Sequence, residues 1–197
     1  MINDISKKIA QKWISKNIIS KEDFELYHYG LFVIITSLEL MVFTLILGIL
    51  FKIIIPSLVF FAIFFTIRRF AGGLHAKTEL HCQILTLLLL FFSIAVIKYF
   101  LSNPNIDYKY FLILYIVSAL LLSLCSPADT PQKPLDFRER IKFKKIIGCL
   151  SLAFLLINFI LMQFKIDFIY VPIVCAFVLE TLLVILGRFF NHRLKDI

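Results

Sequence analysis

A histidine and a cysteine seven residues apart are the side chains of this sequence best suited to covalent chemistry. They lie in the segment RRFAGGLHAKTELHC, which runs from Arg68 to Cys82 between two long apolar stretches. A cysteine protease needs a thiolate, a nearby imidazole that activates it and protonates the leaving amine, and an oxyanion site. Cys82 offers the thiol and His75 the imidazole, so our first hypothesis is a cysteine peptidase.

The neighbouring residues suit the same chemistry. Arg68, Arg69 and a helix that begins near Cys82 would favour the thiolate form of the cysteine. Gly72 and Gly73 permit a tight turn with free backbone N–H groups, which are the donors that an oxyanion site uses. We expect these arginines and glycines to support the reaction.

Two other interpretations of the segment stay open. His75, His81 and Cys82 could bind a metal ion, but they supply only three ligands and lack the spacing of a zinc protease. We therefore expect no metal here. Alternatively, the segment is a plain cytoplasmic turn whose arginines bind lipid headgroups. The residues by themselves do not decide between this turn and a peptidase site.

The spacing of the two histidines predicts a break in the chain. His81 adjoins Cys82, and neighbouring side chains on a helix diverge by about 100°. His75 would share the face of Cys82, but on one straight helix their Cα atoms would lie about 10.5 Å apart. A hydrogen bond needs about 3 Å between heavy atoms. We therefore predict that the chain bends or unwinds between Gly72 and Lys77, and that a helix begins between Lys77 and Cys82.

The remaining cysteines predict no further chemistry. Cys125, Cys149 and Cys175 lie in or at the ends of apolar runs, where cysteine is usually a small packing residue. No CxxC spacing is present, so neither a redox motif nor a disulfide framework is indicated.

The elements that position this segment are expected to be membrane helices. Hydrophobic residues make up 60% of the chain, and the mean hydropathy is +0.92, whereas soluble domains are about 45–50% apolar. Charged residues gather between long apolar runs. The start, MINDISKKIAQKW, lacks the apolar core of a cleavable signal peptide. We predict an all-α polytopic membrane protein with about six transmembrane helices.

The apolar runs give the approximate order of the spans. Two lie between Gly30 and Ile67 as a hairpin that turns near residues 48–56, with a short second arm. The others cover about residues 83–101, 110–125, 146–164 and 168–187. We expect one integral membrane domain over residues 1–197, with a catalytic loop at 68–82 and a basic cytoplasmic loop at 126–145.

Residues 1–20 are expected to form an amphipathic helix on the inner membrane surface. Ile2, Ile5, Ile9 and Trp13 fall on one face of a helix, and lysines occupy much of the rest.

The basic residues predict the topology. On these boundaries, 17 of the 21 lysines and arginines lie on one side of the membrane and four on the other. The positive-inside rule then places both termini in the cytoplasm. The same bias accounts for the net charge of +8 without a nucleic-acid partner, since anionic membrane lipids are natural partners of such lysines.

A small transporter or channel subunit without enzymatic activity is the main alternative from another class. It predicts polar residues spread through several spans and broken helices that line a path. Here the spans are nearly free of such groups and the polar residues collect in the loops. A structural membrane scaffold is a third interpretation.

Two motifs resemble one known family. The segment RRFAGGLHAKTELHC is similar to the hallmark of the AgrB family, the accessory gene regulator peptidases of Gram-positive bacteria. SPADTPQKPL, from Ser126 to Leu135, resembles the family's PADT…KP loop. Chain length, number of spans and order of motifs also agree, so the resemblance covers essentially the whole chain.

The resemblance implies roles for particular residues. In that family the histidine and cysteine seven apart are the catalytic pair, which corresponds to His75 and Cys82. The upstream arginine and the glycine two before the histidine are also functional there, which corresponds to Arg68, with Arg69 beside it, and Gly73. The resemblance suggests a homodimer, and the chemistry requires no cofactor.

The resemblance also implies a function at the bacterial cell membrane. AgrB-like proteins cut a prepeptide, AgrD, on the C-terminal side of its future ring and keep the peptide as a thioester on their cysteine. A thiol or hydroxyl of the peptide then attacks, which releases a cyclic thiolactone or lactone that becomes a quorum-sensing signal.

Several polar residues keep alternative roles. Glu79 or Asp129 could orient His75 as a third catalytic member. Glu39 and Glu180 lie inside apolar runs, where a carboxyl group is either functional or a hydrogen-bond partner between helices. The acidic tail of an AgrD-like peptide, or lipid, is expected to bind lysines of the basic loop, namely Lys133, Lys142, Lys144 and Lys145.

Overall fold

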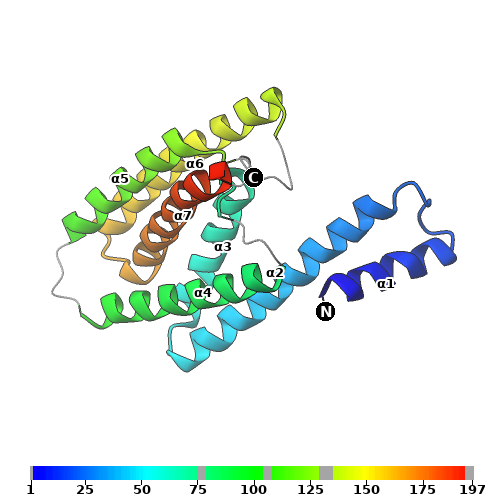
Figure 1. Ribbon diagram of the computed structural model, residues 1–197. Coiled ribbons are helices and arrows are strands. Elements are labelled where there is room, and N and C mark those ends of the chain that lie inside the picture. Colours follow the sequence, from blue (N-terminus) through cyan, green and yellow to red (C-terminus); the bar gives the residue numbers. More distant parts are fainter. Residues whose placement is uncertain (1, 75–78, 104–107, 129–134, 194–197) are drawn as a thin grey trace. The chain divides into compact units, whose positions relative to one another are not determined.

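The described part of the protein is all helical (Figure 1). The computed structural model describes residues 2–74, 79–103, 108–128 and 135–193, with the side chains of residues 79, 108 and 190–193 outside that description. Its helices are α1 (Ile2–Ser15), α2 (Phe24–Leu50), α3 (Ile54–Ala71), α4 (Glu79–Ser102), α5 (Tyr108–Cys125), α6 (Phe137–Gln163) and α7 (Asp167–Arg193). This confirms the prediction of an all-α polytopic membrane protein.

Each predicted span corresponds to one helix. Among the described residues, α2, α3, α4, α6 and α7 are long and apolar enough to cross a membrane by length and composition. The apolar part of α5 is shorter and covers Lys109–Cys125. A helix of that length reaches about 26 Å, slightly less than the hydrocarbon core of about 30 Å, so it can cross where the bilayer is thinned.

The chain divides into two compact units, Met1–Phe43 and Thr44–Ile197. In the first unit, α1 packs against the first turns of α2. Trp13 meets Tyr27 edge to face with ring centroids 6.1 Å apart, and His28 Nε2 lies 2.9 Å from Asn3 Oδ1. Ile5 is exposed on α1, so part of the apolar face predicted for the membrane surface stays available.

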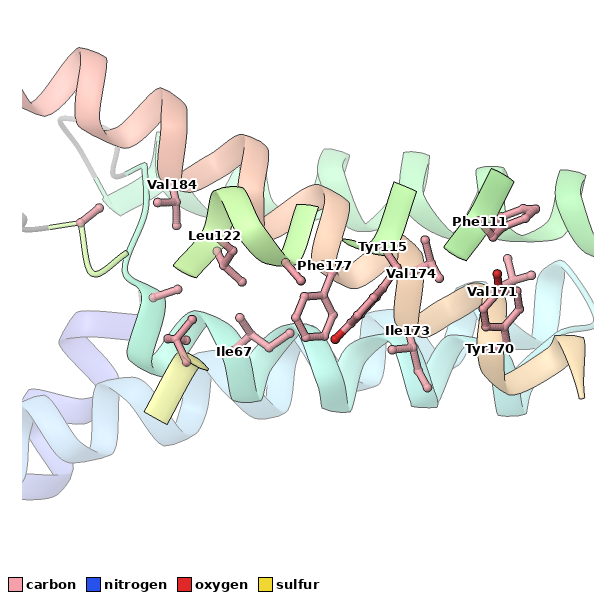
Figure 2. Close-up of a cluster of buried hydrophobic side chains, with 14 residues drawn as sticks. Ile67, Phe111, Tyr115, Leu122, Tyr170, Val171, Ile173, Val174, Phe177 and Val184 are labelled. Carbon is pink, nitrogen blue, oxygen red and sulfur yellow. The ribbon is translucent and has the colours of Figure 1, made fainter. Parts of the chain in front are cut away.

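In the second unit, α7 is the central helix and packs against α3, α4, α5 and α6. Figure 2 shows the apolar cluster that α7 forms with α3 and α5. The rings of Tyr115 and Phe177 lie edge to face at 4.7 Å, and the Tyr115 hydroxyl donates to the Ser151 carbonyl at 2.7 Å. In lipid, such close packing and interhelical hydrogen bonds are what hold helices together.

The helix boundaries correct two predicted loops. Residues 68–71 and 79–82 of the expected catalytic loop belong to α3 and α4, so the non-helical part begins only at Gly72. The expected basic loop 126–145 is also too long, since α6 begins at Phe137 rather than near residue 146. The cause is a capping box between Asp136 and Glu139, followed by arginines and lysines with good helix propensity.

Candidate functional site

The end of α3 begins the candidate site. Arg68 and Arg69 lie in the last turn of α3, where the negative end of the helix dipole favours cationic side chains. Gly72 has a φ of 74° and Gly73 a φ of 140°. Residues with side chains rarely adopt these values, so the two glycines end the helix and turn the chain.

Ala128 from the second motif packs directly on this turn. Its backbone N–H donates a hydrogen bond of 2.8 Å to the carbonyl of Ala71, and it forms an isolated parallel bridge with Gly72. A Cβ atom on Gly72 would overlap the carbonyl oxygen of Ala128. The structure therefore joins the two sequence motifs at one point, beside the ends of α3 and α5.

A glycine of α7 supports the same turn from another side. A Cβ atom on Gly187 would lie 2.5 Å from the carbonyl carbon of Gly73 and 2.8 Å from the backbone nitrogen of Leu74. Contacts that short would displace backbone atoms, so the absence of a side chain at Gly187 lets the turn lie against α7.

Arg68 connects the turn to the interior of the bundle. Its Nη2 donates to the carbonyl oxygen of Leu74 at 3.1 Å, and its Nη1 lies 3.5 Å from Oε2 of Glu180. The guanidinium also lies 5.8 Å from the ring centroid of Phe64, within range of a cation–π interaction. By contrast, Arg69 is exposed and lies over the ring of Phe70.

The cysteine singled out by the sequence lies in the first turn of α4. Cys82 is half-buried, and Thr86 Oγ1 donates to its carbonyl oxygen at 2.8 Å. Helix α4 begins at Glu79, which confirms that a helix starts between Lys77 and Cys82. Cys82 therefore lies at the N-terminal end of α4, which is the positive end of the helix dipole.

Some predicted site residues lie outside the described part of the chain. They are His75, Asp129, Lys133 and the side chain of Glu79. The predicted pairing of His75 with Cys82, and the orienting roles of Glu79 and Asp129, thus stay predictions. His81 is described and exposed beside Cys82.

Three of the predicted substrate-binding lysines lie on a helix instead of a loop. Lys142, Lys144 and Lys145 are exposed in the early turns of α6. The described residues contain no group of three histidine, cysteine or acidic side chains placed to hold a metal ion.

Sequence reasoning missed the contacts that α7 makes with the turn. The position of Glu180 in an apolar run predicts that this carboxyl group has a function or a partner. It does not predict that the partner is Arg68. Gly187 carried no signal at all, because a glycine near a helix end has many uses.

Comparison with known proteins places the chain in a family. Its sequence matches the family Accessory gene regulator B over residues 3–186. AgrB-like protein 2 of Clostridium perfringens is 26% identical over 148 residues, which is 74% of this chain and 69% of the relative. Accessory gene regulator protein B of Staphylococcus epidermidis is 31% identical over 147 residues, 73% of each chain. The same protein of Staphylococcus intermedius is 25% identical over 149 residues, 75% of this chain and 77% of the relative. No solved structure matches the chain. Since the match extends from α1 into α7 and includes both motifs, this protein belongs to the accessory gene regulator B family.

Proposed function

We propose that this protein is a membrane cysteine endopeptidase that processes an AgrD-like prepeptide into a cyclic quorum-sensing signal. The observation that carries the proposal is the sharp end of α3 at Gly72 and Gly73, followed by Cys82 in the first turn of α4. In this proposal His75, in the connection between the two helices, pairs with the Cys82 thiol as the sequence predicts. Family membership supports a role in the accessory gene regulator system.

The proposed reaction starts at the Cys82 sulfur. The thiolate attacks the scissile carbonyl of the prepeptide, and the positive end of α4 beside Cys82 favours the negative charge that develops. The backbone N–H of Gly72 does not serve as the oxyanion donor that the sequence suggested, because it donates to the Arg68 carbonyl at 3.2 Å. Protonated His75 gives its proton to the leaving amine, so the C-terminal part of the peptide departs and a thioester remains on Cys82. In this scheme Glu79 or Asp129 orients the imidazole.

Ring closure follows by exchange of one acyl bond for another. A thiol or hydroxyl of the bound peptide passes its proton to His75 and attacks the thioester carbonyl. The thiolactone or lactone forms, the bond to Cys82 breaks, and the sulfur leaves as a thiolate. Exchange between thioesters is nearly isoenergetic, whereas hydrolysis is strongly downhill, so the site must exclude water and hold the nucleophile close.

The test is cleavage of a synthetic AgrD-like peptide by the full chain reconstituted in lipid nanodiscs. We expect a thioester adduct on Cys82 by mass spectrometry, no cleavage by Cys82→Ala and almost none by Cys82→Ser. Cys149→Ala is the matched control, because Cys149 is an exposed free cysteine on α6, and it should cleave normally. Cleavage by Cys82→Ala would refute the proposal.

A further inference from the structure

Glu180 is a fully buried carboxyl group in the central helix, and the proposed reaction does not yet use it. None of its surface is exposed. Its neighbours along α7 are mostly apolar residues. Oε2 lies 3.5 Å from Arg68 Nη1, while Oε1 has no hydrogen-bond partner among the described atoms. A buried carboxyl group in lipid is costly, so its retention calls for a specific partner.

Arg68, the partner of Glu180, also binds the backbone beside His75, the proposed general base. Nη2 of Arg68 donates to the carbonyl of Leu74 at 3.1 Å, and Leu74 directly precedes His75. The guanidinium is planar and rigid, so its two terminal nitrogens keep a fixed separation, and a contact at one of them restricts where the other can lie. A carboxyl group that holds Nη1 therefore also restricts where the Leu74 carbonyl can lie.

Close contacts at Gly73 and Gly187 leave little space for the turn after α3 to shift relative to α7. A Cβ atom on Gly73 would lie 3.0 Å from Arg68 Nη1 and 3.6 Å from Leu183 of α7. Gly187, almost two turns after Glu180 on the same helix, contacts the backbone of Gly73 and Leu74. Helix α7 thus holds the turn at two points, through the side chain of Glu180 and through the surface at Gly187.

We propose that Glu180 is a positioning residue that acts through Arg68 to hold the carbonyl of Leu74, the residue that precedes the proposed base His75 in the sequence. The inference rests on the proposed function, since it assigns Glu180 to the same site. Glu180 has no contact with the peptide in this scheme, because it is buried in the bundle. Its loss should therefore lower the rate of the chemical step and leave peptide binding nearly unchanged.

A structural ion pair between α3 and α7 is the competing explanation, and kinetics separate the two. We expect Glu180→Gln to lower kcat about 10- to 100-fold, the range that a displacement of about 1 Å can cause, with KM within about twofold. Glu39→Gln is the matched control, since Glu39 is an exposed carboxyl group in the apolar run of α2. It should keep full kcat. An unchanged kcat in Glu180→Gln would overturn the inference.

A double-mutant cycle tests whether Glu180 acts through Arg68. In the Arg68→Gln background, Glu180→Gln should change the single-turnover rate of Cys82 acylation less than about twofold. A further tenfold loss would show that Glu180 acts independently and would overturn the inference. If Glu180→Gln does not fold, Glu180→Asp decides: it keeps the acid, retracts it by one methylene, and should also lower kcat with KM unchanged.

Cys82→Ala in the same assay separates this inference from the proposed function. If Cys82→Ala is inactive and Glu180→Gln is fully active, only the role of Glu180 fails. If Cys82→Ala cleaves the peptide, the peptidase proposal fails first.

Discussion

The backbone N–H of Ala128 donates a hydrogen bond of 2.8 Å to the carbonyl of Ala71. This contact joins the turn after α3 to the segment after α5, which are the two places where the sequence resembles the AgrB family. It also puts these two connections on one side of the bundle, as the distribution of basic residues predicts.

The contact at Gly72 makes a strong prediction for a small substitution. Gly72→Ala would place a Cβ atom against the carbonyl oxygen of Ala128 and force alanine to φ 74° and ψ −144°. Backbone strain of this kind costs about 1–3 kcal/mol. We expect a melting temperature in detergent lower by about 2–10 °C, together with reduced peptide cleavage.

Gly148→Ala is the control for Gly72→Ala. Gly148 lies within α6, and nothing is within 4 Å of a Cβ atom built there. Alanine is favoured over glycine in a helix by about 1 kcal/mol, so this variant should be as stable as the parent or more stable. Equal melting temperatures for both variants would contradict the contact described at Ala128.

The two histidines near Cys82 should differ sharply in their contribution to the rate. His75→Ala should lower cleavage about 100-fold or more, the usual scale for loss of a general base. His81→Ala should keep most of the activity, because its side chain diverges from that of Cys82 along α4. The measurement is kcat/KM with a synthetic AgrD-like peptide. An inactive His81→Ala beside an active His75→Ala would reverse the assignment.

The exposed lysines of α6 should contribute to peptide binding through long-range charge attraction. Replacement of Lys142, Lys144 and Lys145 by glutamine should weaken binding of a peptide with an acidic tail more at low salt than at high salt. Fluorescence anisotropy in nanodiscs of neutral lipid removes competition from anionic headgroups. Equal affinities of the parent and the triple variant at low salt would show that these lysines contact only lipid.

Labelling of single cysteines in intact cells tests the orientation in the membrane. In a variant whose four native cysteines are replaced, Lys8→Cys and Asn191→Cys should resist an impermeant thiol reagent applied from outside. Asn103→Cys is the positive control, because Asn103 is exposed at the end of α4 on the predicted outer side. Labelling at position 8 or 191 before the cells are broken would contradict cytoplasmic termini.

The helices were predictable because a chain that crosses lipid must satisfy its own backbone hydrogen bonds, and the end of α3 was predictable from its two glycines. Apolar runs long enough to span a bilayer had to be helical, and the glycines at 72 and 73 marked where α3 ends. The start of α6 at Phe137 was less predictable, because charged residues are usual at the end of a membrane span, yet arginine and lysine are good helix formers once a cap is present.

The side-chain contacts of the candidate site were less predictable. Arg68 and Glu180 are 112 positions apart, and a carboxyl group in an apolar run does not reveal which cation it faces. The close approach of Gly187 to Gly73 depends on how α7 crosses the end of α3, which periodicity does not determine. The roles of His75 and Cys82 thus stay predictions from the sequence, whereas the contacts of Arg68 and Gly187 with their neighbours came only from the structure.

The central position of α7 has a consequence for biogenesis. Helices α3 and α5 leave the ribosome well before α7, at about 5–20 residues per second. Until α7 inserts, the core residues of α3 and α5 lack their packing partner, and Arg68 lacks its buried counter-group. A nascent chain can therefore carry the complete Arg68–Cys82 segment while the helix that supports this segment, α7, is still missing. Peptide processing should begin only after α7 has entered the membrane.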